Sequence, residues 1–452
     1  MVEIRANRHY LHRPACKMTS VFRFAGLINS ESFEKAIELA MNKHELLCST
    51  VYRNDDGVAY YKYEPGTKAQ VKLSVEKYEP ADPEDEDIEN MLDIAKEWLN
   101  EEEKVLLDIR SGEFMHHGIF TDGVETVWAI SSHFLAGDFL SIKIFAKEVL
   151  EIYESILSNK HKNVDTSFIA FEEDNFNLDA GIERLSFPIK RQIKRLNKNW
   201  QRQGARFDWE DFEKIHKNFH EAYSIKKIFD TIDGDTTQVI LQESIKTNIS
   251  LDSLLAAAFQ LASRENESFA FPLSTRIESN KSFGQFSGSI TLERAGGFLQ
   301  NDLLTNAKKI DSRLNEKLEA KNSDEIINRS NILIAAYAGT LIDSAYYAAF
   351  DGFKNTSAGL MQKIFSLDKA GEGMQINNLG DINFESENLS LRETYFVPSF
   401  LPNFRRVIAF DIVGDNLCLS SSFYQDDKVE YLIFEKVKDL LQDFAQSKMK
   451  NY

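Results

Sequence analysis

The stretch SSHFLAGDFLSI, residues 131–142, lies where a strand-like run ends and a helix-like pattern begins. The preceding residues, VETVWAIS (124–131), are rich in β-branched and aromatic side chains, which favour a strand. From Phe139 to Leu157, apolar residues recur at spacings of three and four, which predicts an amphipathic helix. His133 therefore stands at the end of a predicted strand, just before a loop that contains Gly137.

His133 has two interpretations. Open α/β folds carry reactive groups in loops at strand ends, and a histidine with the ordinary pKa of about 6.5 can accept a proton at neutral pH. Alternatively, Asp138 is a good N-cap for the predicted helix, and a His-x-x-x-x-Asp spacing arises readily by chance among nine histidines. On these residues alone, the structural interpretation is favoured.

The segment HHGIFTDG (116–123) also pairs histidines with an aspartate. Its Asp122-Gly123 dipeptide, however, falls between two strand-like runs, where it favours a tight hairpin turn. Consecutive side chains of a strand point to opposite faces, so His116 and His117 would not act together. The sequence therefore predicts a hairpin here rather than a reactive site.

The chain has 452 residues, which is long for a single hydrophobic core. Strand and helix signals alternate in two successive parts, which predicts an α/β fold with an N-terminal subdomain at 1–180 and a C-terminal one at 181–452. The second includes a basic crossover segment at 181–235. Beyond it, TQVILQES (237–244) is predicted as a strand, and the apolar run that follows as a helix capped by Ser250.

The formal net charge of −18 argues against nucleic acid as a partner, because phosphate binding needs an excess of Lys and Arg. A local exception is KRQIKRLNKNWQRQ (190–203). The favoured interpretation is a solvated helix face. The alternative is a docking patch for an acidic carrier protein or a phosphate-bearing cofactor.

No apolar run is long enough to span a membrane, and the N-terminus lacks the apolar core of a signal peptide. The three cysteines, Cys16, Cys48 and Cys418, fit neither a disulfide framework nor a zinc site. The histidines likewise show no spacing typical of metal ligands. We therefore expect a cytoplasmic protein with no bound metal.

SHFLAGD (132–138) resembles the His-His-x-x-x-Asp-Gly signature of the condensation-domain and chloramphenicol-acetyltransferase-like superfamily, and in particular its stand-alone alcohol-acetyltransferase-like branch. The second histidine of that signature, which is catalytic in the family, falls on His133, and Ser132 replaces the first. The likeness extends over nearly the whole chain. The similar segments are FRFAGLINSESFEKAIELAMNKHELLCSTVYRNDDG (22–57), ISLDSLLAAAF (249–259), FPLSTRIES (271–279), FGQFSG (283–288) and INNLGDI (376–382).

The chain departs from the signature at one point, because Gly137-Asp138 stands where the family has Asp-Gly. In the family this aspartate forms a salt bridge with an arginine of the second half, which Arg276 matches, and holds the histidine loop in shape. Either the loop rearranges around Gly137 so that the bridge forms, or Asp138 only caps the helix and Arg276 finds another acceptor.

The resemblance implies two chloramphenicol-acetyltransferase-like subdomains, each a mixed sheet flanked by helices, in a V with a tunnel between them. A phosphopantetheine thioester, acyl-CoA or an acyl-carrier protein in trans, would enter from one side and a small alcohol or amine acceptor from the other. No cofactor would be permanently bound. His133 would be the general base.

The same resemblance makes Ser287 and Ser289 candidates for stabilising the oxyanion, and Asn378 and Gly380 candidates for shaping the tunnel. The altered signature supports an alternative. In it, the protein is a catalytically degenerate relative that binds a carrier protein, a small molecule or a partner enzyme.

Overall fold

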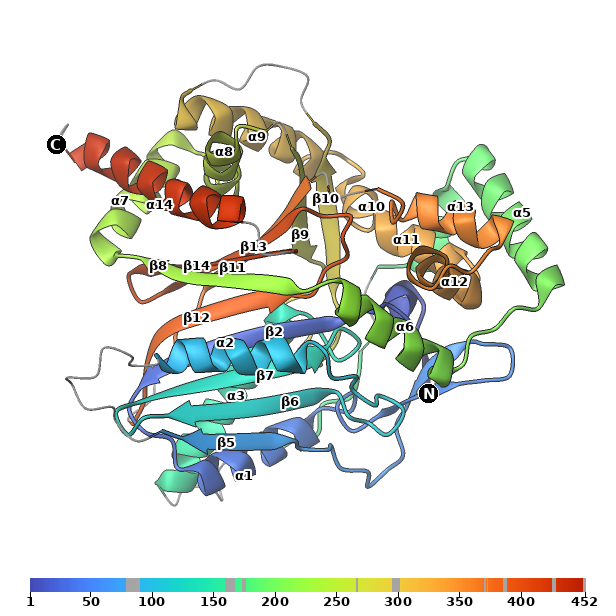
Figure 1. Ribbon diagram of the computed structural model, residues 1–452, viewed down its shortest axis with the longest axis horizontal. Coiled ribbons are helices and arrows are strands. Elements are labelled where there is room, and N and C mark those ends of the chain that lie inside the picture. The colour runs from blue at the N-terminus through green and yellow to red at the C-terminus, as the bar shows by residue number, and fades with distance from the viewer. Residues whose placement is uncertain are drawn as a thin grey trace.

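The computed structural model describes residues 1–78, 90–158, 167–172, 176–265, 267–294, 301–369, 371, 373–384, 388–424 and 428–449. Two mixed β-sheets form two lobes, one above the other in Figure 1, with helices on their outer faces. A group of helices extends to one side of both lobes. This is the α/β architecture of two subdomains that the sequence predicts.

The first lobe is built on a five-stranded sheet in the order β12-β2-β7-β6-β5, in which only the β5–β6 pair is parallel. Trp128 lies at the centre of its core, with its ring 5.0 Å from Phe33 and 5.3 Å from Phe22. The elements are β2 (Lys17–Ala25), α1 (Ser30–Lys43), β5 (Leu73–Lys77), α2 (Met91–Glu102), β6 (Met115–Thr121), β7 (Glu125–His133), α3 (Phe139–Leu157) and β12 (Ser390–Pro398).

The predicted hairpin at 114–131 is confirmed, because β6 and β7 pair antiparallel across the turn at Asp122-Gly123. The predicted helix after His133 is confirmed as α3. A small three-stranded sheet, in the order β1-β4-β3, lies beside the lobe. Its strands are β1 (Val2–Glu3), β3 (Thr50–Arg53) and β4 (Ala59–Lys62).

The second lobe is built on a six-stranded sheet in the order β10-β9-β11-β13-β14-β8. Helices α7, α8, α9 and α14 cover its outer face (Figure 1). The elements are β8 (Ile225–Ile232), α7 (Gly234–Thr247), α8 (Leu251–Ser263), β9 (Ser268–Ser274), β10 (Ser287–Leu292), α9 (Leu303–Leu318), β11 (Gly373–Asp381), β13 (Arg406–Val413), β14 (Asn416–Tyr424) and α14 (Lys428–Met449).

The prediction of a strand at 237–244 is wrong, because these residues lie inside α7. Asp233 caps this helix by accepting a hydrogen bond from the backbone of Thr236, and Thr237 and Ile240, three residues apart, are buried. A run of β-branched residues thus forms a helix where a cap and packing favour one. The predicted cap of the next helix is confirmed, since the Ser250 hydroxyl accepts from the backbone of Ser253.

One strand crosses between the two parts of the chain. β12 follows β11 of the second sheet, yet it pairs antiparallel with β2 of the first. It then leads into β13, which returns to the second sheet. Residues 390–398 therefore complete the sheet of the first lobe, although they lie far beyond residue 180.

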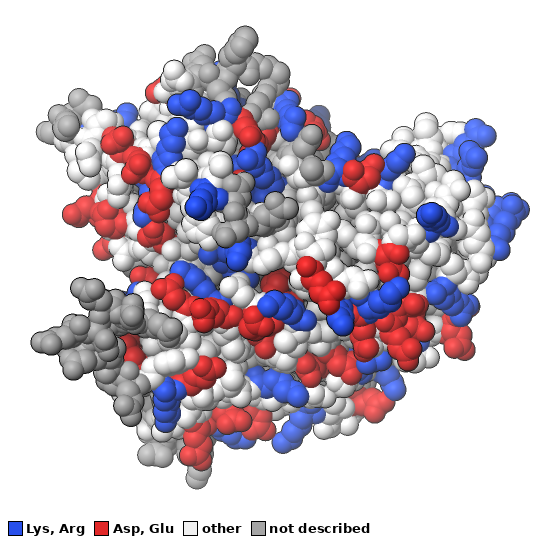
Figure 2. All heavy atoms as spheres, in the orientation of Figure 1, with Lys and Arg blue, Asp and Glu red and all other residues white. Residues whose placement is uncertain are grey.

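The lateral helices include the basic segment. In α5, Ile193, Leu196 and Trp200 are buried, and the Lys and Arg side chains face solvent, at the end of the molecule where blue spheres gather in Figure 2. This is the arrangement of a solvated helix face. The elements are η1 (Ala6–Tyr10), α4 (Leu178–Arg184), α5 (Phe187–Gln203), α6 (Trp209–Ala222), α10 (Ser323–Ile327), α11 (Arg329–Ala336), α12 (Gly339–Phe350) and α13 (Thr356–Ile364).

Within the described part of the chain, no single helix is long and apolar enough to cross a membrane. One bent pair, α11 and α12, passes the same test of length and composition with a break of 102° between its halves.

Candidate active site

The loop after His133 joins the two lobes. Asp138 caps α3 by accepting a hydrogen bond of 2.8 Å from the backbone N–H of Ser141. The other oxygen of the same carboxylate accepts a 3.0 Å hydrogen bond from the backbone N–H of Phe286, which belongs to the second lobe. The backbone N–H of Asp138 donates to the carbonyl of Gly284, again across the lobes. The end of this loop at Asp138 is therefore held against the second lobe.

Arg276 reaches the same carboxylate from the second lobe. Its Nη2 atom lies 3.6 Å from Oδ1 of Asp138 and donates a 2.6 Å hydrogen bond to Oγ of Ser141. Its Nη1 atom donates to the carbonyls of Ser282 and Asn280 at 2.6 Å and 3.2 Å. The two alternatives drawn from the sequence thus occur together, since Asp138 both caps the helix and lies within ion-pair distance of Arg276.

At Gly137 the loop packs tightly against Phe283 and Ser141. A Cβ atom at this position would come within 2.7 Å of the Phe283 ring and 2.8 Å of Cβ of Ser141. A residue with a side chain, including the aspartate that the family has here, would therefore displace a neighbour. The reversed order of Gly137 and Asp138 is compatible with the tight contact between the lobes.

His133 itself is fully buried, with 0% of its surface exposed. The backbone N–H of Leu135 donates a 3.0 Å hydrogen bond to Nδ1 of the ring. Because a backbone N–H only donates, Nδ1 is the acceptor and the single proton of the neutral ring is on Nε2. That Nε2 atom is buried without a hydrogen-bond partner. Burial, together with the charge of Lys17, lowers the pKa of His133 to about 3.

This geometry leaves the His133 ring with no free lone pair. Lys17 lies opposite His133 in the β2–β7 register, and its ammonium group donates to the carbonyl of Glu102. The ring is therefore enclosed beside a buried cation, close enough to His216 of α6 to influence the pKa of that residue. For His133 to accept a proton, its bond to Leu135 would have to break and the ring would have to reach solvent or substrate.

A cavity of about 400 Å³ lies between the lobes. The first lobe contributes Phe134, Asp138 and Phe139, and the second lobe contributes polar side chains from β9, β10 and β11. Of the residues singled out in the sequence, Asp138, Ser287, Ser289 and Asn378 line this interlobe cavity. His133, Arg276 and Gly380 are outside its lining.

The residues of β11 have other roles as well. The amide of Asn378 donates a 2.7 Å hydrogen bond to Asp252, and Gly380 has a φ of +67° at an irregularity in the pairing of β11 with β13. A positive φ is the conformation that favours glycine, so Gly380 shapes the end of the strand.

The N-terminal segment also contributes to the cavity, which the sequence patterns did not indicate. His9, Tyr10 and Arg13 line it, and they come from η1 and the residues just after it. The signal was present in the run RHYLHR (8–13), which combines basic and aromatic side chains, but nothing in it shows that it packs against α11 and α12.

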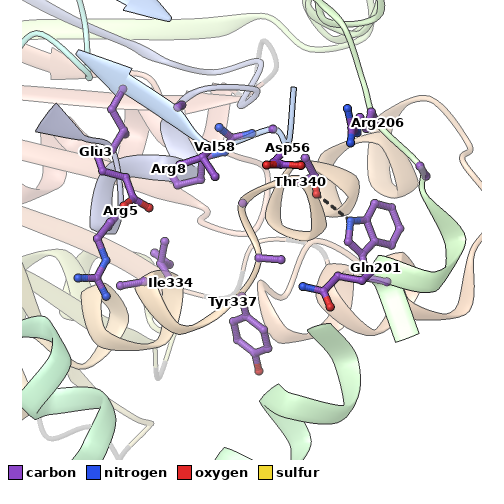
Figure 3. A pocket seen from close by; sticks show the side chains of 18 of the residues that line it. Glu3, Arg5, Arg8, Asp56, Val58, Gln201, Arg206, Ile334, Tyr337 and Thr340 are labelled. Atoms are coloured by element: carbon purple, nitrogen blue, oxygen red, sulfur yellow. Dashed lines mark hydrogen bonds between the residues drawn. The ribbon is translucent and has the colours of Figure 1, made fainter. Parts of the chain in front are cut away.

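A second cavity, of about 510 Å³, lies on the other side of Ile334, which lines both (Figure 3). Its wall carries charges of both signs, with Glu3 and Asp56 near Arg5 and Arg206. A third cavity, of about 320 Å³, shares Gln285 and Asn331 with the interlobe cavity and Arg5 with the second. The three cavities are therefore neighbours that share parts of their walls.

A family model described as the condensation domain matches residues 7–262, which is more than half of the chain. The chain belongs to the condensation-domain family. The sequence has no significant match among curated proteins.

Solved structures of condensation domains share the fold over nearly the whole chain. The first condensation domain of the CDA synthetase matches with a TM-score of 0.62 and 13% identity, covering 98% of this chain and 95% of that one. The condensation domain of the Monacolin K polyketide synthase MokA matches with a TM-score of 0.61 and 11% identity, covering 98% and 97%.

An acetyltransferase has the same fold. The TRI3 trichothecene 15-O-acetyltransferase from Fusarium sporotrichioides matches with a TM-score of 0.63 and 12% identity, covering 97% of this chain and 94% of that one. At such low sequence identity, these similarities establish the two-lobed fold alone. The substrates of this condensation-family protein have to be inferred from its own residues.

Proposed function

We propose that this protein transfers an acyl group from a phosphopantetheine thioester to a small alcohol or amine. The donor is acyl-CoA or an acyl-carrier protein acting in trans, and the transfer takes place in the interlobe cavity. Membership of the condensation-domain family and the likeness to the TRI3 acetyltransferase both support acyl transfer.

The observation that carries the proposal is the interlobe cavity itself. Its volume of about 400 Å³ falls in the usual range for small-molecule sites. Apolar side chains such as Phe134 and Phe139 alternate in its wall with hydroxyl and amide groups. Because both lobes contribute to the wall, a donor and an acceptor can be held face to face, and such positioning can contribute substantially to the rate of a two-substrate transfer.

Hydroxyl groups of the second lobe that line the cavity support a role in binding the acyl carbonyl, although the Ser287 hydroxyl donates to Oε1 of Gln285 at 3.2 Å and would have to turn away from it. Ser287 and Ser289 are half-buried on β10, and both line the interlobe cavity. Hydroxyl donors directed at a developing oxyanion stabilise it more in an enclosed site than they would in water. We assign them this role in the proposed reaction.

The resemblance also proposes His133 as the general base. In its present geometry the ring is neutral, buried and engaged with Leu135, so this role requires a rearrangement of the 133–138 loop. The same observation favours a second candidate function, in which the protein binds a pantetheine-bearing ligand or a partner and performs no transfer.

The two functions are separated by assaying purified protein with acetyl-CoA, longer acyl-CoAs and acyl-pantetheine, each with a panel of alcohols and amines. Transfer predicts thiol release that depends on the acceptor, together with an acylated product in the mass spectrum. Binding alone predicts a calorimetric signal with coenzyme A and no product.

A variant that fills the cavity provides the control. Ser289→Trp places a large ring in the interlobe cavity and should abolish transfer. Ile245→Trp, at a position of α7 that is 82% exposed, should leave it unchanged. Equal activity of the two variants would place the reaction elsewhere.

A further inference from the structure

We propose that the interlobe cavity takes a substrate with a carboxylate group, which pairs with Arg13. The inference rests on the proposed acyl transfer and deepens it, because it names the chemical class of one of the two substrates. The carboxylate is carried either by the acceptor, as in a hydroxy acid or an amino acid, or by the acyl group, as in the half-thioester of a dicarboxylic acid.

The wall of the interlobe cavity contains a positive charge that its own acidic group does not neutralise. Among the described residues that line the cavity, only Arg13 and Asp138 carry a formal charge at neutral pH. The Asp138 carboxylate accepts hydrogen bonds from the backbone N–H groups of Ser141 and Phe286. It also lies 3.6 Å from Nη2 of Arg276. Asp138 is therefore committed to the contact between the lobes and not to Arg13.

The guanidinium of Arg13 is held in place by uncharged groups. It lies 5.6 Å from the ring centroid of Tyr10 and 5.4 Å from that of Phe134, and Nη2 donates a 3.1 Å hydrogen bond to the carbonyl oxygen of Ser399. Its Nε atom is buried without a hydrogen-bond partner. Among the described residues, none supplies a carboxylate that forms an ion pair with this guanidinium. Its position is thus fixed, while its charge is left for another group.

The carboxylate of Glu103 also contacts Ser399, but it has partners of its own. It accepts a hydrogen bond from the Ser399 hydroxyl and lies 3.9 Å from Nζ of Lys227. The charge of Glu103 is therefore offset by a lysine. In a chain with a net charge of −18, Arg13 is left without an acidic partner in an enclosed site. Such an arrangement costs free energy, which the carboxylate of a ligand would recover.

The geometry of the cation matches a carboxylate close to the transfer site. A guanidinium is planar and offers a fork of N–H donors that fits the two oxygens of a carboxylate. Phe134, near whose ring the Arg13 guanidinium lies, directly follows His133 in the chain. A carboxylate bound by Arg13 would therefore be separated from the reacting carbonyl by a short chain, so we expect a small substrate. The phosphates of the donor are farther away, because the pantetheine arm separates them from the thioester.

The first experiment measures specificity with matched substrates in the acyl-transfer assay. Small hydroxy and amino acids are each compared with their methyl esters as acceptors, and succinyl-CoA is compared with butyryl-CoA as donor. We expect the carboxylate form to have the higher kcat/KM in one of the two comparisons, by about 10–100-fold, the range for a hydrogen bond between charged groups. The comparison that shows the preference identifies the substrate that carries the charge. Transfer with no preference in either comparison would overturn the inference and leave the proposed function intact.

Variants assign the preference to Arg13. Arg13→Gln should remove the preference for the carboxylate form and change the activity toward the neutral form little, whereas Arg13→Lys keeps the charge and should retain part of the preference. The matched control is Arg206→Gln, because Arg206 lines the second cavity and is outside the lining of the interlobe cavity. It should behave as the wild type. If Arg13→Gln lowers kcat/KM equally for the carboxylate and neutral forms, Arg13 acts on the acyl carbonyl or on the fold, and the inference is wrong.

A second experiment measures binding independently of transfer. Calorimetry titrates succinyl-CoA, butyryl-CoA and the acids with their esters into the wild type and Arg13→Gln, and matching thermal midpoints establish that the variant is folded. We expect Arg13→Gln to weaken binding of the carboxylate ligand by about 10–100-fold and that of its neutral partner little. Binding that depends on Arg13 in a protein that performs no transfer would overturn the proposed function alone. An equal loss of affinity for both thioesters would assign Arg13 to the phosphates of the donor and contradict the inference.

Discussion

Nη2 of Arg276, in the second lobe, lies 3.6 Å from Oδ1 of Asp138, in the first, and the two residues share the hydroxyl of Ser141. The carboxylate of Asp138 thus caps α3, lies within ion-pair distance of Arg276 and links the two lobes. The arrangement arises although Gly137 and Asp138 stand in the reverse of the family order.

Removing the guanidinium should loosen the contact between the lobes. Arg276→Ala leaves Asp138 and Ser141 without this donor, and hydrogen bonds to charged groups of this kind contribute about 1.5–3 kcal/mol. We expect a lower thermal midpoint by calorimetry. Arg191→Ala, on the exposed face of α5, is the control and should have little effect. Equal midpoints for the two variants would mean that the pair contributes nothing to stability.

Even a methyl group at position 137 should destabilise the protein. Gly137→Ala brings a methyl group to 2.7 Å from the Phe283 ring, and overpacking of this kind costs about 1–3 kcal/mol. Chemical denaturation measures the loss, and Phe283→Leu in the same chain should recover part of it. The matched control is Gly359→Ala in α13, where a Cβ meets nothing within 4 Å. Gly137→Ala as stable as that control would show that the loop yields without cost.

The tautomer of His133 can be observed directly. Long-range nitrogen–proton NMR of histidine-labelled protein should show His133 with its proton on Nε2, since Nδ1 accepts from Leu135. Its pKa of about 3 predicts no titration between about pH 5 and 8. The His133→Gln spectrum assigns the signal. A ring that titrates near its ordinary pKa would indicate that the 133–138 loop opens in solution.

Asp411 should make stability depend on pH. Burial raises its pKa to about 8, and the hydroxyl of Thr394 on the crossing strand β12 donates to its carboxyl group. Because the folded pKa lies above the unfolded value, the carboxyl stabilises the fold at low pH, and this contribution declines as pH rises from about 4 to about 8.

Asp411→Asn tests this dependence. The amide keeps an acceptor for Thr394 and does not ionise, so the thermal midpoint of the variant should gain on that of the wild type as pH rises from about 5 to about 8. The corresponding difference in the free energy of unfolding amounts to a few kcal/mol, on the order of one kcal/mol or more for each unit of pKa shift. A difference between the two proteins that is constant with pH would contradict the raised pKa of Asp411.

Several helices and turns could be predicted because they depend on residues close together in the sequence. The hairpin ending at His133, the helix α3 with its Asp138 cap and the helix α8 with its Ser250 cap could all be predicted, because turn residues, caps and helical spacing act over a few residues. The resemblance to the family added the arginine of the second half that meets Asp138.

Features that depend on contacts between residues far apart in the sequence could be seen only in the tertiary structure. Residues 237–244 are helical because Asp233 caps them and one side of α7 packs inward, and β12 joins the first sheet because β2 presents an open edge. The state of the His133 ring was likewise beyond the sequence. Burial and the hydrogen bond from the backbone N–H of Leu135 set its tautomer, and a backbone group carries no signature in the residue types.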